Sequence, residues 1–156
     1  MLYHYFPGKR DFYVEVATVA TNRLLAATDV GDAGSSLERL EATMAAYVAY
    51  LERYPAGFMA IHRGSISDDA RVRSTVERYK RTQIRRALAD LGRDEGEDPR
   101  LELALRGWLA FVLETSLEHI KAPVLSSGEL AGLFVAAMQA LIGSGGVVRP
   151  KEVESK

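Results

Sequence analysis

Apolar residues recur at intervals of three and four positions along almost the whole chain. No stretch alternates apolar and polar residues in the way that a half-buried strand does. The spacing places apolar side chains on one face of a helix, so we expect an all-α fold, a multi-helix bundle. The predicted helices cover residues 9–28, 36–53, 56–63, 68–91, 100–120 and 127–142. The bundle therefore spans residues 9–142, with a short segment at 1–8 and a polar, Gly-rich flexible tail at 143–156.

Several helix starts carry capping signals. Two Ser and Glu pairs have the spacing of a capping box, Ser35 with Glu38 and Ser126 with Glu129. Asp98 followed by Pro99 predicts another start, because an acidic cap and a proline at the first helical position are both favourable there. Ser67 is expected to cap the helix over residues 68–91.

The apolar stripes predict which faces of the helices are buried. On the first helix the stripe runs through Phe12, Val16, Val19, Ala20 and Leu24. On the last helix it runs through Leu130, Leu133, Phe134, Ala137, Met138 and Leu141. On the helix over residues 68–91 the stripe is interrupted by Gln83, which stands where an apolar residue is expected.

Composition narrows the class of protein. The 156 residues are 47% hydrophobic and suffice for one domain, and a formal charge of -1 removes the strongest compositional argument for a nucleic-acid binder. The basic run over residues 71–86 is expected to be a solvated helix face with a Glu77 to Arg81 pair. Zero cysteines and three scattered histidines argue against any metal site, and we expect no cofactor and a cytoplasmic location. The charge-free stretch over residues 130–148 is broken by glycines and is too short to span a membrane.

The last two helices are more apolar than one bundle needs. Between residues 101 and 117 the only charges are Glu102, Arg106 and Glu114, and apolar residues face most directions around the axis. A second apolar face indicates a partner subunit, so we expect a homodimer formed by these two helices. The expected interface residues are Leu105, Leu109, Leu130, Phe134, Ala137 and Leu141.

The most specific string is Leu-Tyr-His-Tyr-Phe-Pro-Gly-Lys-Arg-Asp-Phe at residues 2–12. It resembles the junction after the DNA-recognition helix of TetR-family transcriptional repressors, and the run Gly-Trp-Leu-Ala-Phe-Val at 107–112 resembles their dimerisation helices. The resemblance implies that residues 1–8 are a remnant of the recognition helix and turn. It also implies that Tyr3, Tyr5 and Lys9 contact DNA phosphates in an intact protein. The preceding helices of a helix-turn-helix are absent from this sequence, so we expect operator DNA as a partner only of an intact protein.

The resemblance further implies an effector cavity inside the bundle, lined by aromatic walls with a few polar anchors. The expected lining residues are Val16, Tyr47, Tyr50, Phe58, His62, Tyr79, Gln83, Trp108 and Phe111. His62, Gln83 and the tyrosine hydroxyls are the expected anchors, and the effector is expected to be small and lipophilic. The whole chain is then the effector-binding and dimerisation part of a ligand-responsive regulator, a repressor, and not an enzyme.

Two alternatives stay open at this point. One is a headless helical module that only binds a ligand or a partner. The other is a small helical-bundle enzyme that uses Glu114, His62 or Tyr79.

Overall fold

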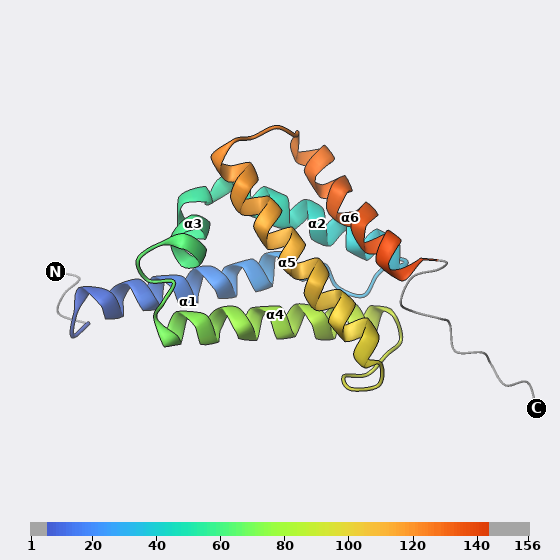
Figure 1. Ribbon diagram of the computed structural model, residues 1–156, viewed down its shortest axis with the longest axis horizontal. Coiled ribbons are helices and arrows are strands. Elements are labelled where there is room, and N and C mark those ends of the chain that lie inside the picture. Colours follow the sequence, from blue (N-terminus) through green and yellow to red (C-terminus); the bar gives the residue numbers. More distant parts are fainter. Residues whose placement is uncertain (1–5, 144–156) are drawn as a thin grey trace, which may run out of the picture.

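The computed structural model describes residues 6–143, which form six α-helices and no strand (Figure 1). The helices are α1 (Lys9–Ala27), α2 (Ser36–Arg53), α3 (Pro55–Arg63), α4 (Ala70–Asp90), α5 (Pro99–Lys121) and α6 (Ser127–Ile142). The all-α prediction is confirmed, with helix ends within two residues of those expected. The expectations for Tyr3 and Tyr5, and for the tail after Gly143, lie outside the described residues.

Local capping chemistry sets most of the helix starts. Both predicted capping boxes are present: at α2 the Ser35 hydroxyl accepts from the amide of Glu38 at 3.2 Å, and the Glu38 carboxylate accepts from the amide of Ser35 at 2.7 Å. Asp98 caps α5 as expected. The prediction for Ser67 is wrong, because Asp69 caps α4 by accepting from the amide of Arg71 at 2.9 Å. The Ser67 hydroxyl instead donates to the carbonyl oxygen of Gly64, within the turn before α4.

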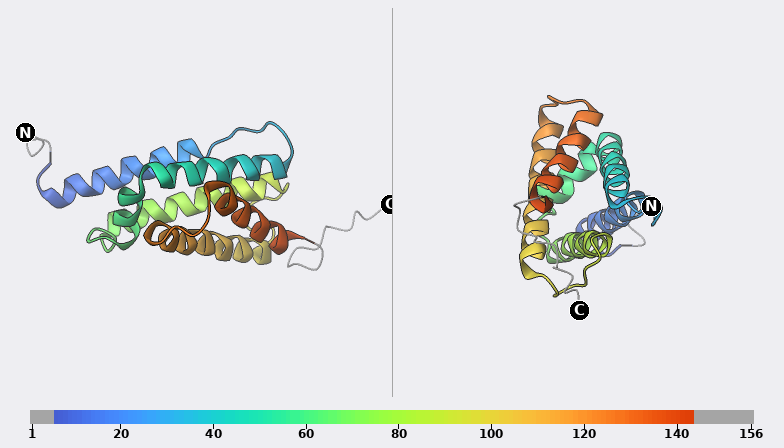
Figure 2. Two further views of the ribbon diagram at one scale, coloured as in Figure 1. Left: turned by 90° about the horizontal axis from the view of Figure 1, so that it is seen from above. Right: turned by 90° about the vertical axis from the view of Figure 1, so that its right-hand side faces the viewer.

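The helices pack in two long pairs. Helices α1 and α4 lie side by side and run in the same direction, whereas α2 runs antiparallel to α6 (Figures 1 and 2). Polar contacts set the register of the first pair, since the Arg78 guanidinium donates to Asn22 and the Gln83 amide donates to Thr28. Helix α5 packs against both pairs. The cavities described below lie within this frame.

Ion pairs hold the N-terminal ends of α1 and α4 together. The carboxylate of Asp69 accepts from Arg10 at 2.8 Å and from Arg71 at 3.1 Å, and Arg71 also reaches Asp11 at 2.7 Å. These contacts, first that of Arg71 and then that of Arg10, hold the pKa of Asp69 well below its usual range. The start of α1 is therefore fixed to the cap of α4.

The basic run on α4 is a solvated face that also makes ion pairs with other segments. The expected pair of Glu77 with Arg81 is not formed, because Glu77 accepts from Lys80 at 2.9 Å. Arg81 lies 3.4 Å from the carboxylate of Glu95 in the loop before α5.

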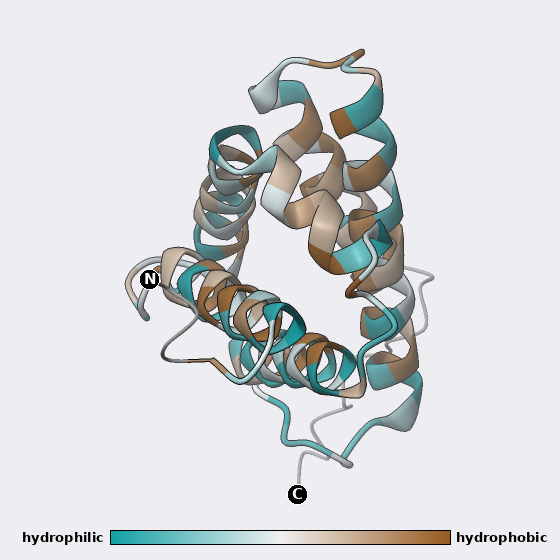
Figure 3. Ribbon diagram, turned by 90° about the vertical axis from the view of Figure 1, so that its left-hand side faces the viewer, coloured by the Kyte–Doolittle hydropathy of each residue, from teal (hydrophilic) through white to brown (hydrophobic). Residues whose placement is uncertain are grey.

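The main hydrophobic core joins α2, α5 and α6, with side chains from α1, α3 and α4 added at its edges. Apolar residues concentrate on the inward faces of the helices (Figure 3). The stripe predicted for α1 is corrected: the helix buries Val14, Ala17, Thr21 and Leu24, while Val16 is 47% exposed. The physical reason is that α1 packs on α4 through Val14 and Ala17 and so turns its other apolar edge away. On α6, Leu133 likewise points outward and is 40% exposed.

Gly64, which ends α3, provides a test of a close backbone contact at the end of this helix. A Cβ at this position would collide with the backbone of Ala60, which cannot move without unwinding the helix. We expect Gly64→Ala to lower the free energy of unfolding by about 1–3 kcal/mol in chemical denaturation. Gly57→Ala in the same helix is the control, because nothing lies within 4 Å of the added methyl group and alanine favours the helix. Equal stabilities of the two variants would contradict the close approach at Gly64.

Candidate ligand-binding site

Two cavities lie beside each other in the bundle. The first, of about 420 Å³, is enclosed by the end of α1 and its following loop, by α2, α3, α4 and by the middle of α5. The second, of about 550 Å³, lies between α1, the end of α2, α3 and α4. Both volumes fall in the range of small-molecule sites in proteins.

Four side chains separate the cavities, because they line both: Phe58, His62, Val76 and Tyr79. We call this set the partition. Phe58 is buried and places its ring edge against Tyr47, with 6.3 Å between the ring centroids. The rings of Phe58 and His62, one turn apart on α3, lie 4.6 Å apart. On α3 the partition therefore presents one buried aromatic ring with a polar ring tilted against it, and on α4 it presents Val76 and Tyr79.

The predicted lining residues divide between the two cavities. Tyr47, Gln83 and Trp108 line the first cavity, and Val16 and Tyr50 line the second. Phe58, His62 and Tyr79 line both. Phe111 is the exception and lies in neither lining. It is 39% exposed on the outer face of α5, with its ring edge against Phe134, because the inward positions of this turn are taken by Trp108 and Val112.

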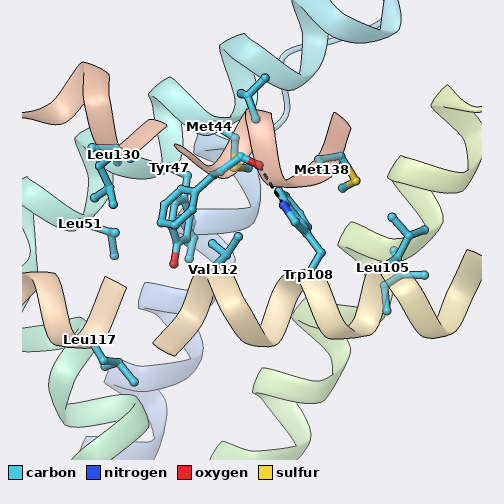
Figure 4. Close-up of a cluster of buried hydrophobic side chains, with 14 of the residues drawn as sticks. Met44, Tyr47, Leu51, Leu105, Trp108, Val112, Leu117, Leu130 and Met138 are labelled. Atoms are coloured by element: carbon cyan, nitrogen blue, oxygen red, sulfur yellow. Dashed lines mark hydrogen bonds between the residues drawn. The ribbon is translucent and has the colours of Figure 1, made fainter. Parts of the chain in front are cut away.

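Two polar groups in the walls, one of them the expected anchor Tyr50, donate hydrogen bonds to backbone carbonyl oxygens. The Trp108 indole donates to the carbonyl oxygen of Phe134 at 2.9 Å (Figure 4). The Tyr50 hydroxyl donates to the carbonyl oxygen of Ala20 at 2.8 Å. These groups fix the walls and leave their aromatic faces to the cavities.

The Tyr47 hydroxyl has a buried partner too. It lies 3.0 Å from the hydroxyl of Ser116, which donates its own proton to the carbonyl oxygen of Val112. Tyr47 is therefore the donor of that pair. Burial raises the pKa of Tyr47 well above its ordinary value, so the phenol stays neutral.

Gln83 and Tyr79 form the polar side of the first cavity on α4. The Gln83 side chain donates to the Thr28 hydroxyl at 2.8 Å, and Thr28 donates to the carbonyl oxygen of Leu24 at 2.9 Å. The interruption of the apolar stripe at Gln83 thus marks a contact between α4 and the end of α1. Burial raises the pKa of Tyr79 to about 12, so its hydroxyl is a neutral donor and acceptor at pH 7.

His62 has a polar ring that the rest of the described chain does not satisfy. Within residues 6–143 its imidazole makes no hydrogen bond, and its ring lies tilted against that of Phe58. Burial, followed by the nearby charges of Lys80 and Arg63, lowers the pKa of His62 to about 4. The ring is therefore neutral at pH 7, with one donor and one acceptor facing the cavities.

The charged residues of the first cavity were not among the predicted lining residues. Arg39, Lys80 and Arg86 line it, each paired with a carboxylate: Arg39 with Asp90 at 2.8 Å, Lys80 with Glu77 at 2.9 Å and Arg86 with Asp29 at 3.2 Å. The positions of these residues in the sequence do not predict the site, because helix packing brings them to it, for example the packing of the start of α2 against the end of α4. The cavity has charges in its wall, but each cation is neutralised.

The surface of α5 and α6 differs from the expected interface. Leu105, Leu130 and Phe134 are at most 2% exposed within a single chain, so the expectation that they face a second copy is corrected. Leu109, Ala137 and Leu141 are half-buried and pack on the main core. The exposed apolar side chains on these helices are Leu103, Phe111 and Leu133. Helices α5 and α6 are as apolar as their sequence indicates, but their most deeply buried side chains fill the core of the single chain instead of facing a second copy.

Glu114, the candidate carboxylate of an enzyme, lies apart from His62 and Tyr79. It accepts two hydrogen bonds from Arg63 at 2.6 and 2.7 Å in an exposed ion pair and lines neither cavity. Among residues 6–143 there is no group of three or more potential metal ligands. Over the same range, no helix has the length and hydropathy to cross a membrane.

Comparison with known proteins gives a match at the level of the family. The family model described as "Tetracyclin repressor-like, C-terminal domain" matches residues 37–141, about two thirds of the chain. The matched range runs from the first turn of α2 to the end of α6 and so includes α5 and α6, the two helices of the expected dimer interface. The comparisons with curated proteins and with solved structures found no match.

The pKa of His62 predicts how stability depends on pH. Between pH 6.5 and 4 the unfolded chain takes up a proton at His62 and the folded chain does not, so the free energy of unfolding falls as the pH is lowered through this window. We expect the wild type to lose about 2 kcal/mol more than His62→Gln over this range, measured by urea denaturation at each pH. The other titrating groups are common to both proteins and cancel in the comparison. Parallel profiles would show that His62 is solvated and protonates freely.

Proposed function

Because the chain belongs to the family of tetracyclin repressor-like C-terminal domains, we propose that it is the effector-binding and dimerisation part of a TetR-type transcriptional repressor. The observation that carries the proposal is the pair of adjoining cavities inside the bundle, whose walls contain eight of the nine expected lining residues. Their aromatic walls and paired charges suit a small lipophilic effector. A regulator of this kind acts on DNA, so we propose a cytoplasmic location.

The proposed mechanism is a shift between two conformations of the bundle. Helix α1 supplies a wall of the second cavity and leads into the loop that lines the first. Its contacts with α4 run along its whole length, from Arg10 at one end to Thr28 at the other. A ligand that favours a different spacing of α1 and α4 would therefore move the N-terminal end of α1. Coupling of this kind is commonly worth about 1–3 kcal/mol.

The N-terminal end of α1 is where the proposed DNA contacts lie. Lys9 is the first residue of α1, and its ammonium group is 5.7 Å from the centre of the Tyr13 ring, on an exposed part of the helix. We propose that Lys9, together with Tyr3 and Tyr5, contacts phosphates in an intact regulator. Such contacts position a protein on DNA without reading its sequence.

The proposed homodimer uses the outer faces of α5 and α6. Leu103 and Phe111 lie two turns apart on α5, and Leu133 points outward from α6. Exposed apolar residues that form a continuous surface mark an interaction site, and pairing with a symmetry mate buries them. Leu109, which lines the first cavity, and Ala137 and Leu141, which pack on the main core, are left out of this proposed surface.

Effector binding is tested on Trp108, the only tryptophan and a wall of the first cavity. Native mass spectrometry of the purified protein identifies a co-purifying molecule, which is then titrated. At about 100 times its Kd we expect it to stabilise the fold by about 2.7 kcal/mol and to change the Trp108 emission.

Matched variants on α4 localise that response. Tyr79→Ala should weaken binding at least about tenfold, because it removes a wall shared by both cavities. Arg85→Ala is the control, since Arg85 is exposed on the same helix and lines neither cavity. A molecule that changes neither stability nor emission would contradict the effector function. Chemical turnover of the bound molecule would favour an enzyme instead.

The dimer is tested at Leu133. We expect the wild type to be a dimer in light scattering at micromolar concentration and Leu133→Glu to be a monomer with unchanged helical circular dichroism, because the substitution places a charge on the exposed apolar face. Gln139→Glu, on the side of α6 that faces α2, is the control and should stay dimeric. A monomeric wild type would contradict the proposed interface.

A further inference from the structure

We propose that the two cavities form one elongated site for a neutral lipophilic ligand that carries a hydroxyl or carbonyl group, and that His62 hydrogen-bonds this group at the partition. The proposal rests on the effector-binding function and names the chemical class of the effector. It follows from three features of the walls: a partition residue that no hydrogen bond holds in place, the pairing of the charges and the unused polar atoms.

The first feature is that the partition has one member that can move at little cost. Phe58 is 4% exposed and is held by its edge contact with Tyr47. His62 makes no hydrogen bond within the described residues, so no bond is lost when its ring turns away from Phe58. Because both cavities reach this ring, its rotation connects them.

The second feature is the pairing of charges, which disfavours an ionised ligand. In the first cavity, each of Arg39, Lys80 and Arg86 is neutralised by a carboxylate within 3.2 Å. An anionic ligand in the first cavity would have to break one of these pairs to reach a cation. A cationic ligand would find a carboxylate without an ion pair among the described residues only at Asp32 in the first cavity and Glu15 in the second, and both are exposed and solvated. The second cavity is lined mainly by apolar side chains of α1 and α3, including Val16, Val19, Leu24 and Ile61. A neutral molecule enters both environments without leaving a charge unpaired.

Two arginines at the second cavity suggest the main alternative class of ligand, a lipophilic anion. Arg23 and Arg53 line it, and neither has a carboxylate within 4 Å among the described residues. Both are exposed at the rim, where water solvates a guanidinium group, so they do not require an anion. A lipophilic carboxylate that uses them is the alternative that the experiment has to separate.

The third feature is the set of unused polar atoms at the partition. Around the partition, the hydroxyls of Tyr47 and Tyr50 and the Trp108 indole are satisfied inside the chain. Within the partition, the Tyr79 hydroxyl interacts with the side chain of Gln83. The neutral His62 ring keeps one donor and one acceptor, and a ligand hydroxyl can pair with either of them. The second cavity has mainly apolar walls, and the cations of the first cavity already have carboxylate partners. The polar group of the ligand is therefore expected at His62 in the partition rather than at the end of either cavity.

A matched pair of probes tests the ligand class. 6-Undecanol and 2-pentylheptanoate each carry two pentyl chains on one central carbon, which bears a hydroxyl group in the first and a carboxylate in the second. With its polar group at the partition, such a molecule extends one chain into each cavity. In calorimetric titrations of the wild type we expect 6-undecanol to bind with one molecule per chain and at least about tenfold more tightly than 2-pentylheptanoate, with a change in Trp108 emission. His62→Phe should weaken 6-undecanol binding about two- to tenfold, because it keeps an aromatic ring and removes the hydrogen bond.

Three valine variants test whether one ligand occupies both cavities. Val19→Phe narrows the second cavity, Val30→Phe narrows the first, and Val124→Phe is the control on an exposed loop outside both. We expect both cavity variants to weaken 6-undecanol binding at least about fivefold and the control to leave it unchanged.

The outcomes separate this proposal from the function on which it rests. Weakening by only one cavity variant would show two independent sites and overturn the single site. Tighter binding of 2-pentylheptanoate, or binding of neither probe while a co-purified effector still binds, would overturn the ligand class and leave the regulator function intact. If the co-purified molecule also fails to bind, the effector function itself is lost.

Discussion

The parallel pairing of α1 with α4 is the constraint on which the cavities depend. Burial of Val14 and Ala17 against Val72 sets which edge of α1 faces the bundle, and polar contacts from Arg10 to Thr28 set its register. With α1 held in this way, Val16 and Val19 turn towards α2 and α3 and become walls of the second cavity instead of core. The same pairing places Thr28 and Asp29 at the first cavity. A change in the spacing of these two helices alters both cavities at once.

A polar side chain is free to bind a ligand only where its polar atoms are not already hydrogen-bonded within the chain. In the aromatic walls, Tyr47, Tyr50 and Trp108 direct their polar atoms to partners in the chain, which makes the walls rigid and chemically apolar. His62 is different because its half-buried imidazole makes no hydrogen bond within the described residues, so its nitrogens are left for water or for a ligand, while its partial burial disfavours the protonated ring. The destabilisation expected at low pH and the proposed contact with a ligand hydroxyl therefore have the same origin.

Local signals predicted the helices well because helix ends depend on neighbouring residues. The Ser and Glu pairs at residues 35 and 38 and at 126 and 129 form the capping boxes that their spacing indicates. The start of α4 was missed because two residues, Ser67 and Asp69, are both good caps and only Asp69 also meets Arg10 across the fold.

Side-chain partners could not be predicted in the same way, because an apolar stripe does not identify what covers it. Phe134 and Leu105 were assigned to a second subunit and instead fill the chain's own core, while Leu133 points outward. Aromatic residues with polar tips on apolar helix faces do predict part of the cavity walls. No sequence pattern predicts the ion pairs of Arg39 and Arg86, because these pairs depend on how the helices pack.

The central claim is that an effector in the bundle moves α1 relative to the rest of a dimer. The sequence contains no cysteine, so Lys9→Cys gives one site per chain for a spin label, at the N-terminal end of α1. Pulsed electron resonance then measures the distance between the two labels of a dimer with and without the co-purified effector. The account predicts that a saturating effector shifts this distance distribution. An unchanged distribution at saturation, with binding confirmed by Trp108 emission, would contradict it.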